Sequence, residues 1–362
     1  MNNQNYKLSE LTTLIARGIT PKYTDSTDSI SVVNQKCIRD GKINFDLCKK
    51  HNHHSKRISS EKILQINDIL INSTGVGTLG RVSQIIDDLS KTTCDSHVTI
   101  VRPDPTKIDP SFLGAFTYLN QKNIESLGHG STGQTELSRL DIGEIDIPKI
   151  SAKKQKFIGD FFQFLNRKIE LNQKTNEILE KIAQALFKSW FIDFDPVKAK
   201  SESRSTGLPD DISDLFPDSF EDSELGKIPS GWKIQSLGSI SKISSGKRPI
   251  SRSETKTSFA KYPLYGGAGP MGFTSEVLIN GTKIITTGRV GTLGKFFRVK
   301  IPTWISDNAL ILVPSDLFYN FCFYRLLNFD ITIFNRGSTQ PLITQSDLKT
   351  IEMISADEKI HK

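Results

Sequence analysis

The longest regular hydrophobic pattern in the chain lies in residues 151–195. Apolar side chains recur there at alternating spacings of four and three residues, which is the heptad pattern of a helix that packs against a partner helix. Ser151 can cap the start of such a helix, and no proline interrupts the pattern before Pro196. The seam positions are Ile158, Phe162, Leu165, Ile169, Asn172, Asn176, Leu179, Ala183, Leu186 and Trp190.

The pattern predicts a single helix of about 38 residues, which would be roughly 57 Å long. Two shorter helices that break near Asn172 are the alternative interpretation. A helix of the predicted length does not fit the core of one small domain, so its apolar seam requires a partner helix. The polar residues in the middle of the seam, Asn172 and Asn176, would fix the register of that pairing at some loss of stability.

Short apolar and β-branched runs lie on both sides of this helix. DILINST (68–74) and TKIITT (282–287) precede two glycine-rich segments, GVGTLGR (75–81) and RVGTLGK (289–295). The first segment has the G-x-G-x-x-G spacing of a dinucleotide-binding loop, but such a loop must open a helix. The residues after the second copy instead have the β-branched and aromatic pattern of a strand, a turn and another strand. Both segments are therefore predicted to be tight turns between strands, with glycine at positive φ.

The resemblance between the two halves extends well beyond the glycine-rich segments. Matching segments occur in the same order, and their spacing drifts only slightly, as insertions in loops would produce. The matching pairs are YKLSEL and WKIQSL, RGITP and GKRP, CDSHVTIVRP and SDNALILVP, FLGAFTYLNQK and FYNFCFYRLLN, and HGSTGQ and RGSTQP. The sequence thus predicts two tandem copies of one domain.

These patterns predict an α+β chain in which two tandem α/β domains of like topology are linked by a long coiled-coil helix. The two domains are expected at 1–150 and 229–353, with the helix at 151–195. Residues 196–228 are polar, contain prolines and are locally acidic, which indicates a linker with one short helical turn near 211–216.

Composition narrows the class of protein and partner. The chain has 362 residues, a formal net charge of +7 and a pI near 9.0, a basic excess that is compatible with a polyanionic partner. It has neither a run of 18 apolar residues nor the start of a signal peptide, so we expect it to be neither membrane-spanning nor secreted. The four cysteines are widely scattered, which is typical of reduced thiols in a cytosolic protein.

No group of residues in the sequence matches a catalytic site. The chain has no phosphate-binding P-loop, and neither a methyltransferase nor a nuclease signature is present. His51, His53 and His54 form a cluster beside basic residues, but a second ligand group at a standard metal-site spacing is missing. This cluster is interpreted as a solvated basic loop that approaches phosphate, and we expect no catalytic and no metal-ligating residue in the chain.

Basic and small polar residues recur in corresponding loops of the two halves. Such residues suit contacts with phosphate, and arginine and glutamine can read guanine and adenine edges with two hydrogen bonds. The alternative interpretation is ordinary turns with solvated charge. The candidate nucleic-acid-binding residues are Arg17, Lys22, Arg81, His129, Ser131, Thr132 and Gln134 in the first half, and Lys247, Arg248, Arg289, Lys295, Arg336, Ser338, Thr339 and Gln340 in the second.

Several longer segments resemble the specificity (S) subunits of Type I restriction–modification systems. They are NQKTNEILEKIAQALFKSWFIDFDPV (172–197), FPDSFEDSELGKIPSGWKIQSLGSI (216–240), SGKRP (245–249), ITTGRVGTLGKF (285–296) and RGSTQPLIT (336–344). The resemblance covers nearly the whole chain. It implies two target-recognition domains, each of which reads one half of a bipartite DNA site.

The resemblance also implies partners and cofactors. Two long antiparallel spacer helices would hold the domains apart and dock modification (methyltransferase) subunits, with restriction subunits in the full complex. S-adenosylmethionine, ATP and Mg²⁺ would be bound by those partner chains, so no cofactor is expected in this one. The chain itself would be a non-catalytic, cytoplasmic DNA-binding subunit.

The pattern departs from the family at its C-terminal end. A second spacer helix should follow the second domain, but residues 354–362 supply only its start. We therefore expect the exposed seam to bind either a second copy of the chain or helices of a modification subunit. The alternative function is a non-catalytic protein-interaction scaffold without sequence-specific DNA binding.

Overall fold

The computed structural model describes residues 5–89, 91–130, 135–291, 293–337, 340–357 and 360. The chain divides into two compact units, Met1–Thr175 and Asn176–Lys362. All four cysteines lie in the described part and are free thiols. Within the described residues, no helix is both long enough and apolar enough to cross a membrane.

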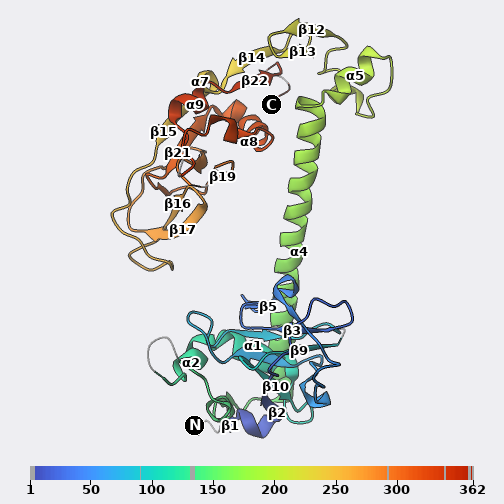
Figure 1. Cartoon of the computed structure of the whole chain (residues 1–362), viewed down its shortest axis with the longest axis vertical. Coiled ribbons are helices and arrows are strands. Elements are labelled where there is room, and N and C mark those ends of the chain that lie inside the picture. The colour runs from blue at the N-terminus through green and yellow to red at the C-terminus, as the bar shows by residue number, and fades with distance from the viewer. Residues whose placement is uncertain are drawn as a thin grey trace. The chain divides into compact units, whose positions relative to one another are not determined.

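Unit 1 is built around a four-stranded antiparallel sheet with the strand order β2-β10-β7-β8. A second sheet has the order β6-β3-β9, in which β3 and β9 are parallel, and β1 pairs with β11. Figure 1 labels β1, β2, β3, β9 and β10 among these strands, with helix α1 beside them. The strands are β1 (Asn5–Lys7), β2 (Thr12–Arg17), β3 (Ile30–Val33), β4 (Ile38–Arg39), β5 (Lys42–Ile43), β6 (Lys49–His51), β7 (Ile69–Asn72), β8 (Val82–Gln84), β9 (Thr92–Cys94), β10 (Val98–Pro103) and β11 (Asp146–Pro148).

The main sheet of unit 1 is buried on both faces. Side chains alternate between the faces of a strand, so Ile69 and Ile71 of β7 join one core cluster and Leu70 joins another. The first cluster includes Phe112 of α1, and the second includes Val33 of β3. The helices of unit 1 are η1 (Leu8–Leu11), η2 (Phe45–Leu47), η3 (Ser60–Lys62), α1 (Pro110–Leu119), α2 (Gln121–Ser126) and α3 (Arg139–Gly143).

Unit 2 repeats the topology of these three sheets. Its four-stranded sheet has the order β15-β21-β18-β19, its second sheet has the order β17-β16-β20 with β16 and β20 parallel, and β14 pairs with β22. The strands are β14 (Lys233–Ser236), β15 (Ser241–Ser245), β16 (Tyr262–Gly266), β17 (Gly269–Thr274), β18 (Ile285–Gly288), β19 (Phe296–Arg298), β20 (Trp304–Ile305), β21 (Ala309–Pro314) and β22 (Glu352–Ser355). The predicted pair of like domains is confirmed.

The core of unit 2 is divided by its sheet in the same way. Leu310 and Leu312 of β21 belong to one cluster, whereas Ile311 between them belongs to another. Each fully buried side chain of this size contributes about 1.5–3 kcal/mol. The helices of unit 2 outside residues 196–228 are α7 (Leu237–Ile240), η4 (Asp316–Phe318), α8 (Tyr319–Leu327), η5 (Ile331–Phe334) and α9 (Gln345–Lys349).

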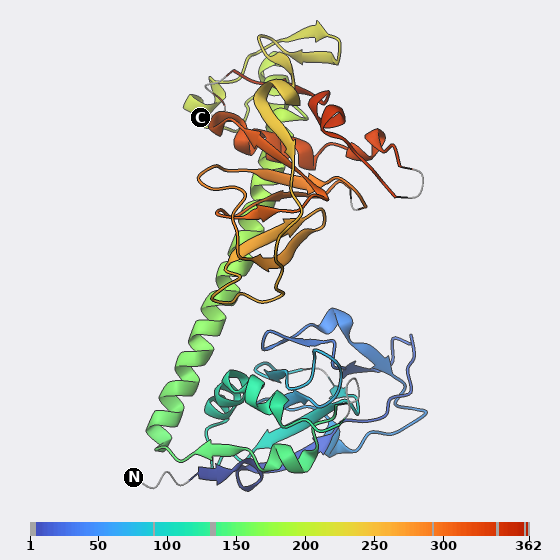
Figure 2. The same ribbon diagram turned by 90° about the vertical axis from the view of Figure 1, so that its left-hand side faces the viewer.

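The predicted long helix is a single element. α4 (Ala152–Phe191) has 40 residues, and both views show it as one continuous coil (Figure 1, Figure 2). The alternative of two helices broken near Asn172 is wrong. In unit 1 its Gly159 lies so close to α1 that an added Cβ would be 2.6 Å from the backbone nitrogen of Phe112. In unit 2 the ring of Phe187 lies 5.7 Å from that of Phe321.

Residues 196–228, which the sequence indicates to be a linker with one short helical turn, contain several regular elements. They form α5 (Asp195–Ser201), α6 (Asp210–Ser213) and a hairpin of β12 (Phe220–Ser223) and β13 (Gly226–Pro229). Val197, Phe216 and Trp232 are buried together in a small core. Apolar side chains spread among the polar ones provide enough buried surface to fold the segment, and the predicted helical turn corresponds to α6.

The end of the second domain also differs slightly from the prediction. β22 continues to Ser355, and Ile354 pairs with Ile234 of β14. The strand therefore occupies the first two positions of the expected second helix at 354–362. Residues 358, 359, 361 and 362 lie outside the described residues.

Candidate nucleic-acid interface

Both glycine-rich segments are loops of β-hairpins. The first joins the antiparallel strands β7 and β8, and the second joins β18 and β19. Gly77 and Gly80 have φ angles of 69° and 75°, and Gly291 and Gly294 have φ angles of 83° and 78°. Residues with a Cβ rarely adopt these angles. The predicted turns are confirmed, and the dinucleotide-binding interpretation is wrong because a strand follows each loop.

In unit 1, backbone hydrogen bonds gather four loops at one end of the four-stranded sheet. After β2, the N–H of Gly18 donates to the carbonyl of Val98 (3.0 Å). At the start of the hairpin loop, the N–H of Ser73 donates to the carbonyl of His97 (2.9 Å). The N–H of Leu137 donates to the carbonyl of Ser73 (2.9 Å), which attaches the loop before α3.

Unit 2 gathers the corresponding loops with the same bonds. The N–H of Gly246 donates to the carbonyl of Ala309 (3.0 Å), and that of Arg289 donates to the carbonyl of Asn308 (2.9 Å). The N–H of Ile343 donates to the carbonyl of Arg289 (3.0 Å). The recurring loops of the sequence are therefore brought together within each unit.

These bonds correct one detail of the repeat. The sequences alone pair Gly75 with Arg289, whereas the hydrogen bonds pair Ser73 with Arg289. Gly80 lies seven positions after Ser73, whereas Gly294 lies only five positions after Arg289. The first hairpin loop is thus two residues longer than the second.

Two glycines allow the loops to meet. A Cβ added at Gly18 would lie 2.1 Å from the carbonyl oxygen of Cys94, and one added at Gly246 would lie 2.2 Å from that of Ser306. Both contacts involve backbone, which cannot turn aside as a side chain can. A glycine is therefore required at the equivalent point of each unit, directly after the first strand of the main sheet.

Three of the predicted DNA-binding arginines already have acceptors in the protein. Arg17 Nη2 donates to Glu136 Oε1 (2.7 Å), and burial lowers the pKa of the Arg17 guanidinium. Arg81 Nη2 donates to the carbonyl of Gly77 (2.7 Å) in its own hairpin loop. Arg336 forms an ion pair with Asp347. These three side chains hold the loops in place, whatever else they contact.

The other predicted residues fall into two groups. Five of them lie outside the described residues, namely Ser131, Thr132, Gln134, Ser338 and Thr339. The described ones are Lys22, His129, Lys247, Arg248, Lys295 and Gln340, which are exposed, and Arg289, which is half-buried. The exposed cations include residues from both units.

The predicted helix seam is largely exposed. Its residues Ile158, Leu165, Ile169, Leu179 and Leu186 are between 39% and 56% accessible. Two other apolar members pack within their own units, where Phe162 lies against Tyr118 and Trp190 lies against Phe216. The seam therefore offers an apolar surface rather than a completed coiled coil.

The apolar face of α4 is wider than the sequence analysis proposed. A second set of exposed apolar side chains lies one position before the seam, at Phe157, Phe161, Phe164, Leu171, Ile178 and Ile182. This set follows the same heptad spacing, so the sequence carried a signal for it. Together the two sets form a broad face that a single narrow seam would not require.

A family model for the Type I restriction modification DNA specificity domain matches residues 2–181 and 229–354. The chain is 28% identical to the HindI specificity subunit of Haemophilus influenzae over 52% of this chain and 50% of that protein. It is 29% identical to the MjaIX specificity subunit of Methanocaldococcus jannaschii over 66% of this chain and 56% of that protein. The matches thus span about half the length of these curated relatives.

The fold also has a counterpart among solved structures. A crystal structure of a Type I restriction–modification S subunit from M. genitalium has a TM-score of 0.55 and 18% identity, over 100% of this chain and 87% of that chain. At this identity the likeness concerns the fold alone. The family model covers most of the chain and both units, so this chain belongs to the family of the Type I restriction modification DNA specificity domain.

Proposed function

We propose that this chain is the DNA sequence-specificity subunit of a Type I restriction–modification complex and that each unit reads one half of a bipartite target. The observation that carries this proposal is the repeated gathering of basic loops at the same end of two like sheets. The scaffolds are equivalent, but the loop side chains differ. Two unequal readers on like scaffolds fit a target whose two halves differ in sequence.

The exposed loop cations anchor the phosphate backbone, and polar loop residues contact base edges. The chain performs no bond-making step of its own. It presents a flipped adenine to the methyltransferase subunit, which with the other partner chains holds S-adenosylmethionine, ATP and Mg²⁺. The basic charge and the free thiols agree with such a role in the cytoplasm.

In this proposal the broad apolar face of α4 docks the modification subunits, and through them the restriction subunits. A second copy of the chain is the other candidate for the same face. An interaction scaffold without DNA recognition is the alternative function, because this face would serve it equally well.

Salt dependence separates the two functions. If the loops bind phosphates, the logarithm of the association constant for duplex DNA falls linearly with the logarithm of salt concentration, by about 0.9 per phosphate contact. Replacing both Lys247 and Arg248 by alanine should weaken binding and reduce that slope. Lys227→Ala, an exposed change on β13 away from the loops, should alter neither. The same salt slope for the unchanged protein, the Lys247 and Arg248 double variant and Lys227→Ala would favour the interaction scaffold.

The division between the units can be tested through methylation. We expect cells that contain this chain and its modification partner to methylate adenine within a split motif. Exchange of residues 1–150 for those of a relative should change one half of the motif and leave the other half intact. A motif that changes in both halves, or in neither, would contradict the proposed division.

A further inference from the structure

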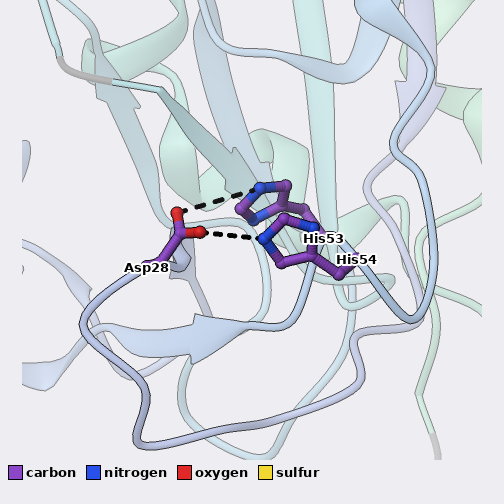
Figure 3. Close-up of side chains that lie close together, drawn as sticks. All are labelled: Asp28, His53 and His54. Carbon is purple, nitrogen blue, oxygen red and sulfur yellow. Dashed lines mark hydrogen bonds and ion pairs between the residues drawn. The ribbon is translucent and has the colours of Figure 1, made fainter.

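Three potential metal ligands from two separate loops meet at the surface of unit 1. His54 Nε2 lies 2.8 Å from Asp28 Oδ2, and His53 Nε2 lies 3.9 Å from Asp28 Oδ1. Figure 3 shows both imidazoles directed at the same carboxylate. The potential ligand atoms all lie within 4.8 Å of one another. The sequence analysis missed Asp28 because 26 residues separate it from His54.

Strand pairing brings these residues together. β3 and β6 are antiparallel, and Ile30 of β3 is paired with His51 of β6. Asp28 precedes Ile30 by two positions and His53 follows His51 by two positions. The register therefore places Asp28 opposite His53 just beyond the end of the ladder. The pairing of β3 with β6 therefore positions both loops that carry the three residues.

A third histidine fixes the loop that carries the pair. His51 is fully buried, its Nδ1 accepts from the N–H of Lys22 (2.9 Å), and its Nε2 lies 2.8 Å from the carbonyl of Lys56. Because both ring nitrogens are in use, His51 serves as a support and not as a ligand. The side chain of Asn52 accepts from the N–H of His54 (3.1 Å), which shapes the turn between them.

The cluster is accessible to an ion from solvent. Asp28 and His54 are exposed and His53 is half-buried, and the carboxylate of Asp28 faces both imidazoles (Figure 3). His53 Nδ1 is buried and has no hydrogen-bond partner among the described residues. His53 Nε2 lies 3.9 Å from Asp28 Oδ1, which is beyond hydrogen-bonding distance, so the cluster itself gives the His53 ring no hydrogen bond.

We propose that Asp28, His53 and His54 form a binding site for a divalent transition-metal ion of the zinc class. Imidazole and carboxylate are the ligands that such ions combine, and three protein ligands leave one tetrahedral position for water. Two ligands about 2.0–2.1 Å from one tetrahedral ion lie roughly 3.4 Å apart, and the two distances to Asp28 bracket that separation. Small side-chain rotations would complete the site.

The bound ion would tie the loop before β3 to the loop after β6 and would stabilise this edge of unit 1. It would also add positive charge beside the basic residues Lys49, Lys50 and Lys56. The proposal does not depend on the proposed function, because metal binding and DNA binding are measured separately.

The test is a titration of the purified, untagged and metal-free full chain with Zn²⁺ by calorimetry, and with Co²⁺ by visible absorption. We expect one ion per chain, the absorption bands of tetrahedral Co²⁺, and a higher melting temperature with Zn²⁺. Mg²⁺ at the same concentration should have no effect, since it rarely accepts imidazole. Absence of binding by Zn²⁺ and Co²⁺ at one ion per chain would overturn the site.

Variants locate the site. Asp28→Ala and His54→Ala should each weaken binding at least tenfold, since even supporting residues around a metal contribute 10–100-fold. His129→Ala is the matched control, because His129 also lies near a carboxylate, 3.6 Å from Asp141, but belongs to no group of three potential ligands among the described residues. Unchanged binding in the first two variants, or equal loss in the control, would contradict the proposal. Circular dichroism verifies that each variant is folded.

Discussion

Asp68 is a fully buried carboxylate whose charge is paired, among the described residues, with a single cation, Arg102. Arg102 donates to it twice, from Nε to Oδ1 (2.7 Å) and from Nη2 to Oδ2 (2.8 Å). The N–H of Gln65 donates to Oδ2 as well (2.8 Å). This bidentate ion pair compensates the desolvation of both charges. Loss of Arg102 would leave the buried carboxylate without a counter-charge.

Arg102→Met should therefore lower the free energy of unfolding by about 3–5 kcal/mol, because it leaves an unpaired buried charge. Urea-induced unfolding measures the change. Lys156→Met is the control, since its ion pair with Asp160 lies on the exposed surface of α4. Such a pair contributes at most about 1 kcal/mol. A similar loss in both variants would refute this explanation.

At the residue scale the sequence indicated which side chains are important, but it did not indicate which residues they bond to. It indicated that the loop arginines were important, but three of them turned out to be bonded within the protein. It could not indicate that Arg102 meets Asp68, because 34 residues separate them. Pairings of this kind depend on strand register, which no local pattern specifies.

The hairpin loop of unit 1 offers a matched pair of glycines with positive φ. A Cβ at Gly80 would lie 2.8 Å from the backbone nitrogen and Cα of Glu125 in α2, whereas a Cβ at Gly77 would have no atom within 4 Å. Gly77→Ala should cost about 1–2 kcal/mol for the left-handed conformation alone. Gly80→Ala should cost about 1–3 kcal/mol more, because backbone must move. Urea unfolding of both variants tests the difference, and equal losses would refute it.

Helices α3 and α9 start with the same capping box, Ser138 with Asp141 and Thr344 with Asp347. The hydrogen bond from Ser138 lowers the pKa of Asp141. Burial opposes a similar shift at Asp347, but the bonds from Thr344 and the charge of Arg336 outweigh it, so the pKa of Asp347 is also lowered.

A lowered carboxylate pKa contributes stability that is present above the unfolded-state pKa of about 3.9 and is lost as the pH falls through the folded-state value. Unfolding free energies should therefore decline as the pH falls below about 4. Asp347→Asn should make that decline shallower while lowering stability at pH 7. Urea unfolding at a series of pH values measures both effects. A pH profile of Asp347→Asn parallel to that of the unchanged protein would contradict this account.

At the element scale the sequence predicted the long helix, both glycine turns and the order of the repeated segments. It did not predict that residues 196–228 fold, because their polar composition masks a few well-placed apolar side chains. Nor could it show that Ser73 is equivalent to Arg289. The two glycine-rich segments align without a gap, so the sequence does not reveal the two extra residues in the first hairpin loop.

In the proposed function, the exposed apolar face of α4 is the surface through which the chain assembles with its partners. Ile169→Glu together with Leu179→Glu should leave the helix content unchanged, because both side chains are exposed. If modification subunits dock on this face, as proposed, the pair should abolish their binding in a co-purification experiment. Lys174→Glu should leave binding intact, because Lys174 occupies the heptad position on the side of the helix opposite the seam. Retained binding in the double variant would show that the partners dock elsewhere.

The repeated domain within each unit begins and ends on one two-stranded ladder. Asn5 of β1 is paired with Pro148 of β11, and Lys233 of β14 is paired with Ser355 of β22. The polypeptide consequently leaves each repeated domain close to where it entered. The domain is therefore a self-contained part of the chain. In the proposed function, homologous recombination at these ladders would replace one domain without disturbing the other, so new specificities would arise by exchange of whole domains rather than by gradual change.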